Sequence, residues 1–377
     1  MPTRPSLRYD PVLLGAVVAL AAFGVVMVYS ASAVFAGERL RDSLFFFKRQ
    51  AAAAGVGLLL LLLTMKIGYR RLESLAVPLL FASLLLLILV HVPGLGHTAG
   101  GARRWVKLGA LQFQPSEIAK IALVLWLARS LARKGERIQL FSVGFLPHLL
   151  VLSVMGALLL AEPDFGTAAV LAGLTFSLLF VAGARFTYLA AALGVAVAIG
   201  AALILTSAYR LDRLRTFLDP WSDPQGRGYQ IVESLVGYGA GGAFGLGLGE
   251  SKQKLFFLPA AHTDFMLSIV GEELGFAGVC AVLVLFAVLV WRGLRAAFAA
   301  PEAFGCYAAL GLTLLFALEA LVNAGMTLSL LPTKGIALPF LSYGMTSAIA
   351  SCLAAGILLS VSGGHGGFLA KPVGGRK

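Results

Sequence analysis

A series of long apolar segments dominates this sequence and limits what the chain can fold into. Each segment is about 18 to 25 residues long, the length of helix that crosses the hydrocarbon core of a bilayer. Charged residues make up only 13% of the 377 residues, about half the share found in soluble domains. The chain therefore cannot cover a large water-facing surface. The pattern predicts an all-α polytopic membrane protein.

We expect about ten membrane-spanning helices within one transmembrane domain that covers residues 1–377. One break interrupts the series, because residues 208–263 form a long, polar, Gly-rich loop. The predicted spans are 11–30, 44–65, 72–92, 116–131, 143–160, 166–183, 186–207, 264–291, 303–328 and 337–361.

The positions of the basic residues predict the orientation in the membrane. Half of the 30 Lys and Arg residues lie at span ends on one side, and the positive-inside rule makes that side cytoplasmic. Both termini are then cytoplasmic, and the long loop is extracytoplasmic. The other half lie on the disfavoured outer side. Four of these cations sit in shorter outer loops, where an anionic ligand would explain them: Arg103, Arg104, Lys107 and Lys334.

The net charge of +12 has a similar explanation. Because the cations lie between apolar segments, lipid headgroups or an anionic lipid-linked substrate are the expected partners, and nucleic acid is not. The His and Cys residues show no metal-ligand spacing. Residues 237–249 contain seven glycines, but no βαβ unit surrounds them, so we expect flexible backbone along the membrane surface instead of a nucleotide site.

The segment Leu258-Pro259-Ala260-Ala261-His262-Thr263-Asp264-Phe265 places a carboxylate at the outer membrane boundary. Two interpretations remain open at this point. Either Thr263 or Asp264 caps the N-terminus of the following helix, or Asp264 is a general base that faces an outer cavity.

Other acids lie within or beside the spans. Glu272, Glu273 and Glu319 are embedded, and carboxylates at such depth usually face the bundle interior. Eight residues of helix would bring Glu272 near the face of Asp264. These acids serve either interhelical hydrogen bonding or a proton pathway. Glu117 and Lys120 are three residues apart, so we expect a structural ion pair.

Several motifs together resemble the SEDS family (shape, elongation, division and sporulation). The resemblance covers nearly the whole chain, with the motifs in the family's order. It rests on GARRWVKLG at 101–109, QPSE at 114–117, EPDFGT at 162–167, GYQ at 228–230, HTDF at 262–265, EELG at 272–275 and PFLSYG at 339–344. One departure is Met345-Thr346-Ser347, where the family usually continues with Gly-Ser-Ser. The segments SKQKLFFLP at 251–259 and LPTKG at 331–335 resemble the division branch of the family more than its elongation branch.

The resemblance implies a peptidoglycan glycosyltransferase that polymerises lipid II on the outer face of the bacterial cytoplasmic membrane. It implies septal wall synthesis, a class B penicillin-binding protein as partner, and contact with other divisome membrane proteins. The family's essential Asp corresponds to Asp264. In such a reaction a sugar hydroxyl displaces pyrophosphate, so one base and several cations suffice. No second carboxylate suited to a retaining mechanism is evident, which favours single-step inversion.

The resulting hypothesis assigns each candidate residue a role. Asp264 deprotonates the acceptor hydroxyl, and Arg103, Arg104, Lys107 and Lys334 bind pyrophosphate or sugar. A divalent cation such as Mg²⁺ or Mn²⁺ is a further expectation without a visible ligand set, and no organic cofactor is expected. The expected supporting residues are Glu117, Lys120, Asp164, Glu272 and Ser342.

Three other functions fit the same sequence. They are an elongation-specific polymerase, a lipid II flippase, and a non-enzymatic scaffold of the division machinery. A flippase would keep its activity when Asp264 is neutralised, whereas a scaffold would complement a deletion without any catalysis.

Overall fold

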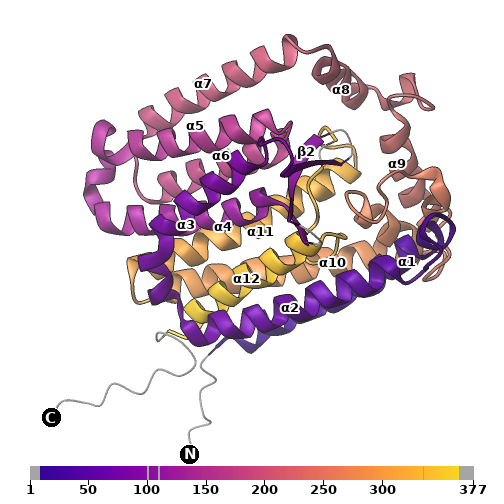
Figure 1. Cartoon of the computed structure of the whole chain (residues 1–377), viewed down its shortest axis with the longest axis horizontal. Helices are drawn as coiled ribbons and strands as arrows, with labels where there is room; N and C mark the ends of the chain where they lie inside the picture. The colour runs from indigo at the N-terminus through magenta and orange to yellow at the C-terminus, as the bar shows by residue number, and fades with distance from the viewer. Residues whose placement is uncertain (1–8, 100–101, 109–110, 334, 365–377) are drawn as a thin grey trace, which may run out of the picture.

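The computed structural model describes residues 9–99, 102–108, 111–333 and 335–364. Its long helices run side by side as a bundle (Figure 1). The α-helices in chain order are α1 (Pro11–Leu40), α2 (Phe45–Ile67), α3 (Tyr69–Leu89), α4 (Pro115–Lys134), α5 (Leu146–Ala161), α6 (Phe165–Val181), α7 (Phe186–Leu205), α8 (Ala208–Leu218), α9 (Tyr229–Gly241), α10 (Met266–Ala299), α11 (Ala303–Thr327) and α12 (Met345–Ser362).

Each of the ten predicted spans overlaps one of these helices, although the last, 337–361, begins eight residues before α12 (Met345–Ser362). Among the described residues, eight helices are long and apolar enough to cross a membrane. The other two are α6, which has 17 residues, and α4, which carries charged residues at both ends. Helix α4 is mostly buried by its neighbours, so its charges can be paired inside the bundle. The predicted polytopic helical fold is confirmed.

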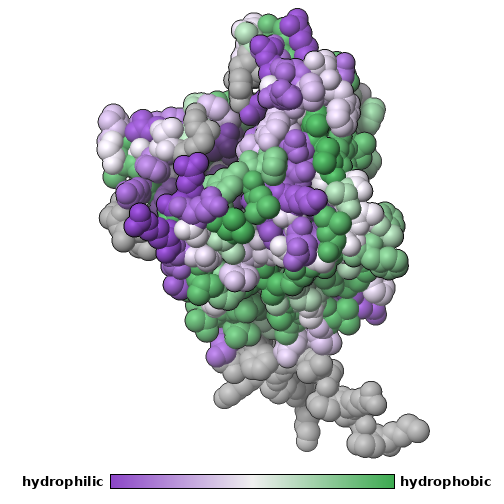
Figure 2. Space-filling model, turned by 90° about the vertical axis from the view of Figure 1, so that its right-hand side faces the viewer, coloured by the Kyte–Doolittle hydropathy of each residue, from purple (hydrophilic) through white to green (hydrophobic). Residues whose placement is uncertain are grey.

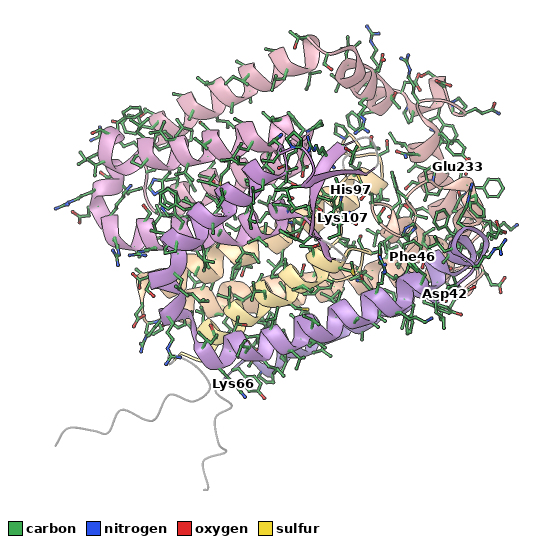
Figure 3. All side chains as sticks on the ribbon, in the orientation of Figure 1. Asp42, Phe46, Lys66, His97, Lys107 and Glu233 are labelled. Carbon is green, nitrogen blue, oxygen red and sulfur yellow. The ribbon has the colours of Figure 1, made fainter. Side chains whose placement is uncertain are left out.

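The start of α1 and the end of α12 meet at one end of the bundle. The backbone N–H of Asp10 donates to Oγ of Ser362 over 3.1 Å, and the Arg292 guanidinium lies 2.6 Å from the Asp10 carboxylate. Lys66 lies at this end, whereas Asp42 and Lys107 lie at the other (Figure 3). We call the end where α1 finishes and α10 begins the outer end. That it faces the cell exterior stays a prediction.

The outer end contains a small sheet that the all-α prediction missed. Strands β1 (Gly96–Ala99), β2 (Ala102–Leu108) and β3 (Leu111–Phe113) form an antiparallel sheet in the order β1-β2-β3. Val106 pairs with Gly96 on one side and with Phe113 on the other. The sequence carries this signal weakly: β2 has the Trp and Val typical of strands, but it is short and lies between much stronger helical segments.

The long outer loop is also more ordered in secondary structure than predicted. It contains α8, a short 3-10 helix η3 (Pro220–Ser222), α9 and a π turn η4 (Gln253–Phe257). Helix α7 leads into it along one edge of the molecule (Figure 1), and Leu189 is its one buried residue. Figure 2 views the molecule from the outer end and shows hydrophilic residues gathered over its upper part, with apolar residues among and below them.

The Gly-rich segment binds to a break in α10. Gly275 has φ 69° and ψ −166°, which interrupts the helix. The carbonyls of Glu272 and Glu273 instead accept hydrogen bonds from the N–H groups of Leu246 and Gly247, each over 3.0 Å. The prediction of a flexible surface backbone is therefore wrong for this segment, because its peptide groups complete the hydrogen bonding of α10.

Gly245 should be intolerant of a side chain, whereas Gly239 should accept one. A Cβ on Gly245 would lie 2.1 Å from the Glu273 carbonyl oxygen, and its φ is +82°, whereas a Cβ on Gly239 meets nothing within 4 Å. Strain at such a position costs about 1–3 kcal/mol. Limited proteolysis in detergent should show faster cleavage of the outer loop in Gly245→Ala than in Gly239→Ala. Equal cleavage would contradict the close approach.

Candidate active site at the outer end

Asp264 lies between the long loop and α10 and does not cap the helix. Helix α10 begins at Met266, and no side chain caps its N-terminus. Asp264 is fixed through its backbone, because the buried Asn323 on α11 donates to its carbonyl over 3.0 Å and to the Ile336 carbonyl over 2.8 Å. The capping interpretation is wrong here, and the Asp264 carboxylate is left for another role.

Arg104 on β2 faces this carboxylate. Its Nε donates to the Glu162 carbonyl over 3.3 Å and its Nη2 to the Pro163 carbonyl over 2.6 Å. A Cβ placed on Gly335 would lie 3.3 Å from Nη1 of Arg104 and 3.4 Å from Oδ2 of Asp264. The two groups thus flank Gly335, where a side chain would enter the space between them.

The surrounding charges set the proton affinity of Asp264. Burial raises the pKa of Asp264 to about 6, the charges of Arg104 and Arg213 oppose this rise, and the Asp164 charge adds to it. Arg213 reaches the site from α8, and its Nη1 donates to the Thr333 carbonyl over 3.2 Å. A carboxylate with a pKa near neutral pH is suited to act as a general base.

Asp164 is close enough to affect Asp264 but is otherwise occupied. It caps α6, where its Oδ1 accepts from the Thr167 N–H over 3.2 Å and its Oδ2 from the Thr167 hydroxyl over 2.8 Å. Only 2% of its surface is exposed. A nucleophile must reach the sugar carbon, so a buried and hydrogen-bonded Asp164 contributes charge and shape rather than a second reactive carboxylate.

The other predicted cations are not all part of this cluster. Arg103 donates to the His91 carbonyl over 3.3 Å and to the Val92 carbonyl over 2.6 Å, and so holds the end of α3. Lys107 is exposed on β2 at the outer end (Figure 3). Lys334 lies outside the described residues, between Thr333 and Gly335.

Glu117 and Lys120 form the predicted ion pair, inside the bundle. Nζ of Lys120 lies 2.9 Å from Oε1 of Glu117 and also pairs with Glu319 on α11. All three side chains are nearly fully buried. The pairing joins α4 to α11 one turn from Asn323, which holds Asp264. The interhelical interpretation of Glu319 is confirmed, and the proton pathway stays a prediction.

Glu272 supports the long loop and not the Asp264 side chain. It accepts from the N–H groups of Lys252 and Gln253 over 2.9 and 3.2 Å, and from the Ser251 hydroxyl. The predicted helical alignment with Asp264 is wrong, because Asp264 precedes the first residue of α10. Beside it, Glu273 forms a buried ion pair with Nζ of Lys254 over 2.8 Å.

Hydrogen bonds from polar side chains hold the segment before α12. One of these residues, Ser342, was predicted as a supporting residue. The Ser342 hydroxyl accepts from the Leu338 N–H over 2.9 Å. Two others were missed. Gln50 on α2 bonds the Ser342 carbonyl and the Gly344 N–H, each over 3.3 Å, and a lone Gln beside a long apolar segment was the available signal. Thr346, at the departure from the family pattern, accepts from the Gln114 N–H over 3.2 Å. This residue therefore ties the start of α12 to the start of α4.

No metal centre accompanies this cluster in the part of the chain that the structure describes, where no three His, Cys, Asp or Glu side chains are grouped to hold an ion. The divalent cation stays a prediction.

The pH dependence of activity should report the environment of Asp264. A base must be deprotonated, so the rate should fall as pH drops through about 6, the pKa of Asp264. The Arg213 charge lowers that pKa, so Arg213→Gln should move the acid limb to higher pH. Arg215→Gln, on the same helix, should leave it in place. The measurement is product formation against pH, and an unmoved limb in Arg213→Gln would refute the assignment.

The fold and this cluster define a multi-pass helical membrane protein with a candidate reactive carboxylate and two arginines at one end of its bundle. The chain belongs to the FtsW, RodA and SpoVE family of cell cycle proteins, which it matches over residues 11–365. The predicted family is confirmed.

Relatives and solved structures agree with this membership. The chain is 51% identical over 357 residues to the probable peptidoglycan glycosyltransferase FtsW of Trichlorobacter lovleyi, covering 95% of this chain and 94% of that protein. A chain of a solved peptidoglycan synthase complex is 34% identical with a TM-score of 0.77, covering 94% and 97%. The rod shape determining protein RodA of Thermus thermophilus is 32% identical with a TM-score of 0.71, covering 95% and 98%.

Proposed function

We propose that this chain is a peptidoglycan glycosyltransferase that polymerises lipid II at the outer surface of the bacterial cytoplasmic membrane. Asp264 accepts the proton of the acceptor hydroxyl as that hydroxyl attacks the donor sugar carbon. The bond from that carbon to pyrophosphate breaks, and the leaving group departs with the electron pair. Because pyrophosphate is a good leaving group, the reaction needs cations more than it needs a general acid.

One observation carries this proposal: Asp264 faces Arg104 across Gly335, at the end of the bundle. Among the described residues, the carboxylate neither caps a helix nor forms an ion pair, and its pKa of about 6 suits a base. Arg104 and Arg213 supply positive charge beside it. The nearby Asp164 is hydrogen-bonded and buried, which supports a single displacement with inversion.

The proposed role is in division. The relative that is 51% identical is named FtsW, whereas the RodA structure is 32% identical. Together with the segments at 251–259 and 331–335, this favours septal synthesis over elongation. A fluorescently tagged copy should gather at midcell, and patches along the lateral wall would support the elongation role instead.

A penicillin-binding protein is the proposed partner. The solved synthase complex concerns polymerization and crosslinking, and this chain shares its fold over 94% of its length. A class B enzyme would crosslink the strands that this chain makes, and other divisome membrane proteins would hold the two at the septum. Co-purification from detergent extracts tests the pairing.

The direct test is synthesis of glycan strands from labelled lipid II by the purified protein, with and without its penicillin-binding partner. Polymer in either reaction supports the transferase. Movement of lipid II across a proteoliposome membrane without polymer would support a flippase. A catalytically inactive variant that still complements a deletion strain would support a scaffold.

A further inference from the structure

Glu162 is the most unusual ionisable group near the candidate site. It lies in the turn between α5 and α6, two residues before Asp164, and none of its surface is exposed. Neither carboxyl oxygen has a hydrogen-bond partner among the described residues. A buried carboxylate is ordinarily paired or hydrogen-bonded, and one that is neither takes up a proton.

Glu162 is also tied to the residue that faces Asp264. Its own backbone carbonyl accepts from Nε of Arg104, and the next carbonyl, of Pro163, accepts from Nη2. Among the described residues, the side chains that act electrostatically on the Glu162 carboxyl are Asp164, from the start of α6, and Arg104, from β2. Arg104 and Asp164 act on Asp264 as well, so Glu162 and Asp264 share the same two charged neighbours.

The ionisation state of Glu162 affects the net charge of the groups around Asp264. Two carboxylates, Asp264 and Asp164, stand against two guanidinium groups, Arg104 and Arg213. If Glu162 were also ionised, these groups together would be negative, and Glu162 would compete with an anionic substrate for Arg104. An additional negative charge beside Arg104 would weaken the attraction of this cation for a pyrophosphate.

We propose that Glu162 is a positioning residue that must remain an uncharged carboxylic acid for polymerisation, because its neutrality leaves the Arg104 charge for the pyrophosphate and for Asp264. This inference rests on the proposed transferase function. Glu162 does not touch the substrate, since it is fully buried. It acts through Arg104. As the pH rises, Glu162 ionises and the polymerisation rate falls.

The burial of Glu162 raises its pKa to about 8, the Asp164 charge adds to the rise, and Arg104 opposes it. The wild-type rate should therefore decline as pH rises through about 8. A carboxyl group one pH unit above its pKa is only about one-tenth protonated. Relative to the rates at pH 7, Glu162→Gln should accordingly be about tenfold faster than wild type at pH 9.

The experiment is the pH profile of lipid II polymerisation by the full chain with its penicillin-binding partner. Glu162→Gln should lose the alkaline limb, whereas Glu250→Gln, on the exposed part of the outer loop, should keep it. If Glu162→Gln does not fold, the pH profile of the polymerisation activity that Asp164→Asn retains provides a second test. Removing the Asp164 charge lowers the pKa of both neighbouring carboxyls, so the acid and alkaline limbs should both move to lower pH.

An alkaline limb that persists unchanged in a folded Glu162→Gln would overturn the proposal, as would a folded Glu162→Gln without activity at any pH. In the fallback experiment, an unmoved alkaline limb in Asp164→Asn would overturn it. Failure of the transferase function itself is distinct, because the wild type would then make no polymer at any pH.

Discussion

Asp264→Asn should lower the rate of glycan polymerisation by about 10²- to 10⁴-fold, the usual contribution of a general base. The amide keeps the size of the side chain but cannot accept the proton. The backbone contacts that hold residue 264, from Asn323 and to Ala260, do not involve its side chain. The fold and the binding of lipid II should therefore survive. The measurement is the initial rate of polymer formation from labelled lipid II, with protein folding checked by thermal unfolding in detergent.

Asp219→Asn is the matched control. Asp219 is exposed and lines a separate polar cavity of about 300 Å³ between α8, η3 and the turn at 223–228. The same chemical change there should leave the polymerisation rate within about twofold. A wild-type rate in Asp264→Asn would show that another group takes the proton.

Replacing Arg104 by Gln should have the second largest effect, and replacing Arg103 should have much less. A cation aimed at developing charge contributes about 10²–10³ in rate, and Nη1 of Arg104 and Oδ2 of Asp264 flank Gly335. The Arg103 guanidinium instead binds carbonyls at the end of α3. Arg103→Gln should thus lower the unfolding temperature and have little effect on the catalytic rate. Steady-state rates and thermal unfolding of both variants separate the two roles.

Arg104→Lys refines this comparison. A lysine retains the charge, but its donors all lie on one nitrogen, so it cannot reproduce the planar fork with which Arg104 bonds the Glu162 and Pro163 carbonyls. We expect partial activity between wild type and Arg104→Gln. Equal loss of polymerisation in the Arg103 and Arg104 variants would contradict the assignment of a structural role to Arg103 and a catalytic role to Arg104.

Helix positions were predictable from the sequence because they depend on a strong local signal. An apolar segment of about 20 residues specifies a spanning helix with little influence from the rest of the chain. This logic located even α4, whose buried charges weaken its apolar character. It could not locate the β1–β3 sheet, because strands of three to seven residues depend on pairing across the sheet.

The reactive residue was predictable and its neighbours were not. Asp264 stands out as an acid at a membrane boundary, and the family motif reinforces it. The approach of Arg104 to Asp264 depends on where β2 and the segment before α10 meet, which sequence spacing does not encode. For the same reason Arg103 and Arg104 looked equivalent, although adjacent residues of a strand point to opposite faces. The sequence assigned no role to Glu162, because its burial and its lack of hydrogen-bond partners are visible only in the tertiary structure.

The central claim is that Asp264 performs glycosyl transfer at the outer membrane surface. Its most direct test uses proteoliposomes that contain the protein, its penicillin-binding partner and labelled lipid II, with polymer formation and lipid movement followed in the same sample. We expect polymer in the wild type and a loss of at least about 10²-fold in Asp264→Asn. Lipid movement that persists in Asp264→Asn, without polymer in the wild type, would contradict it.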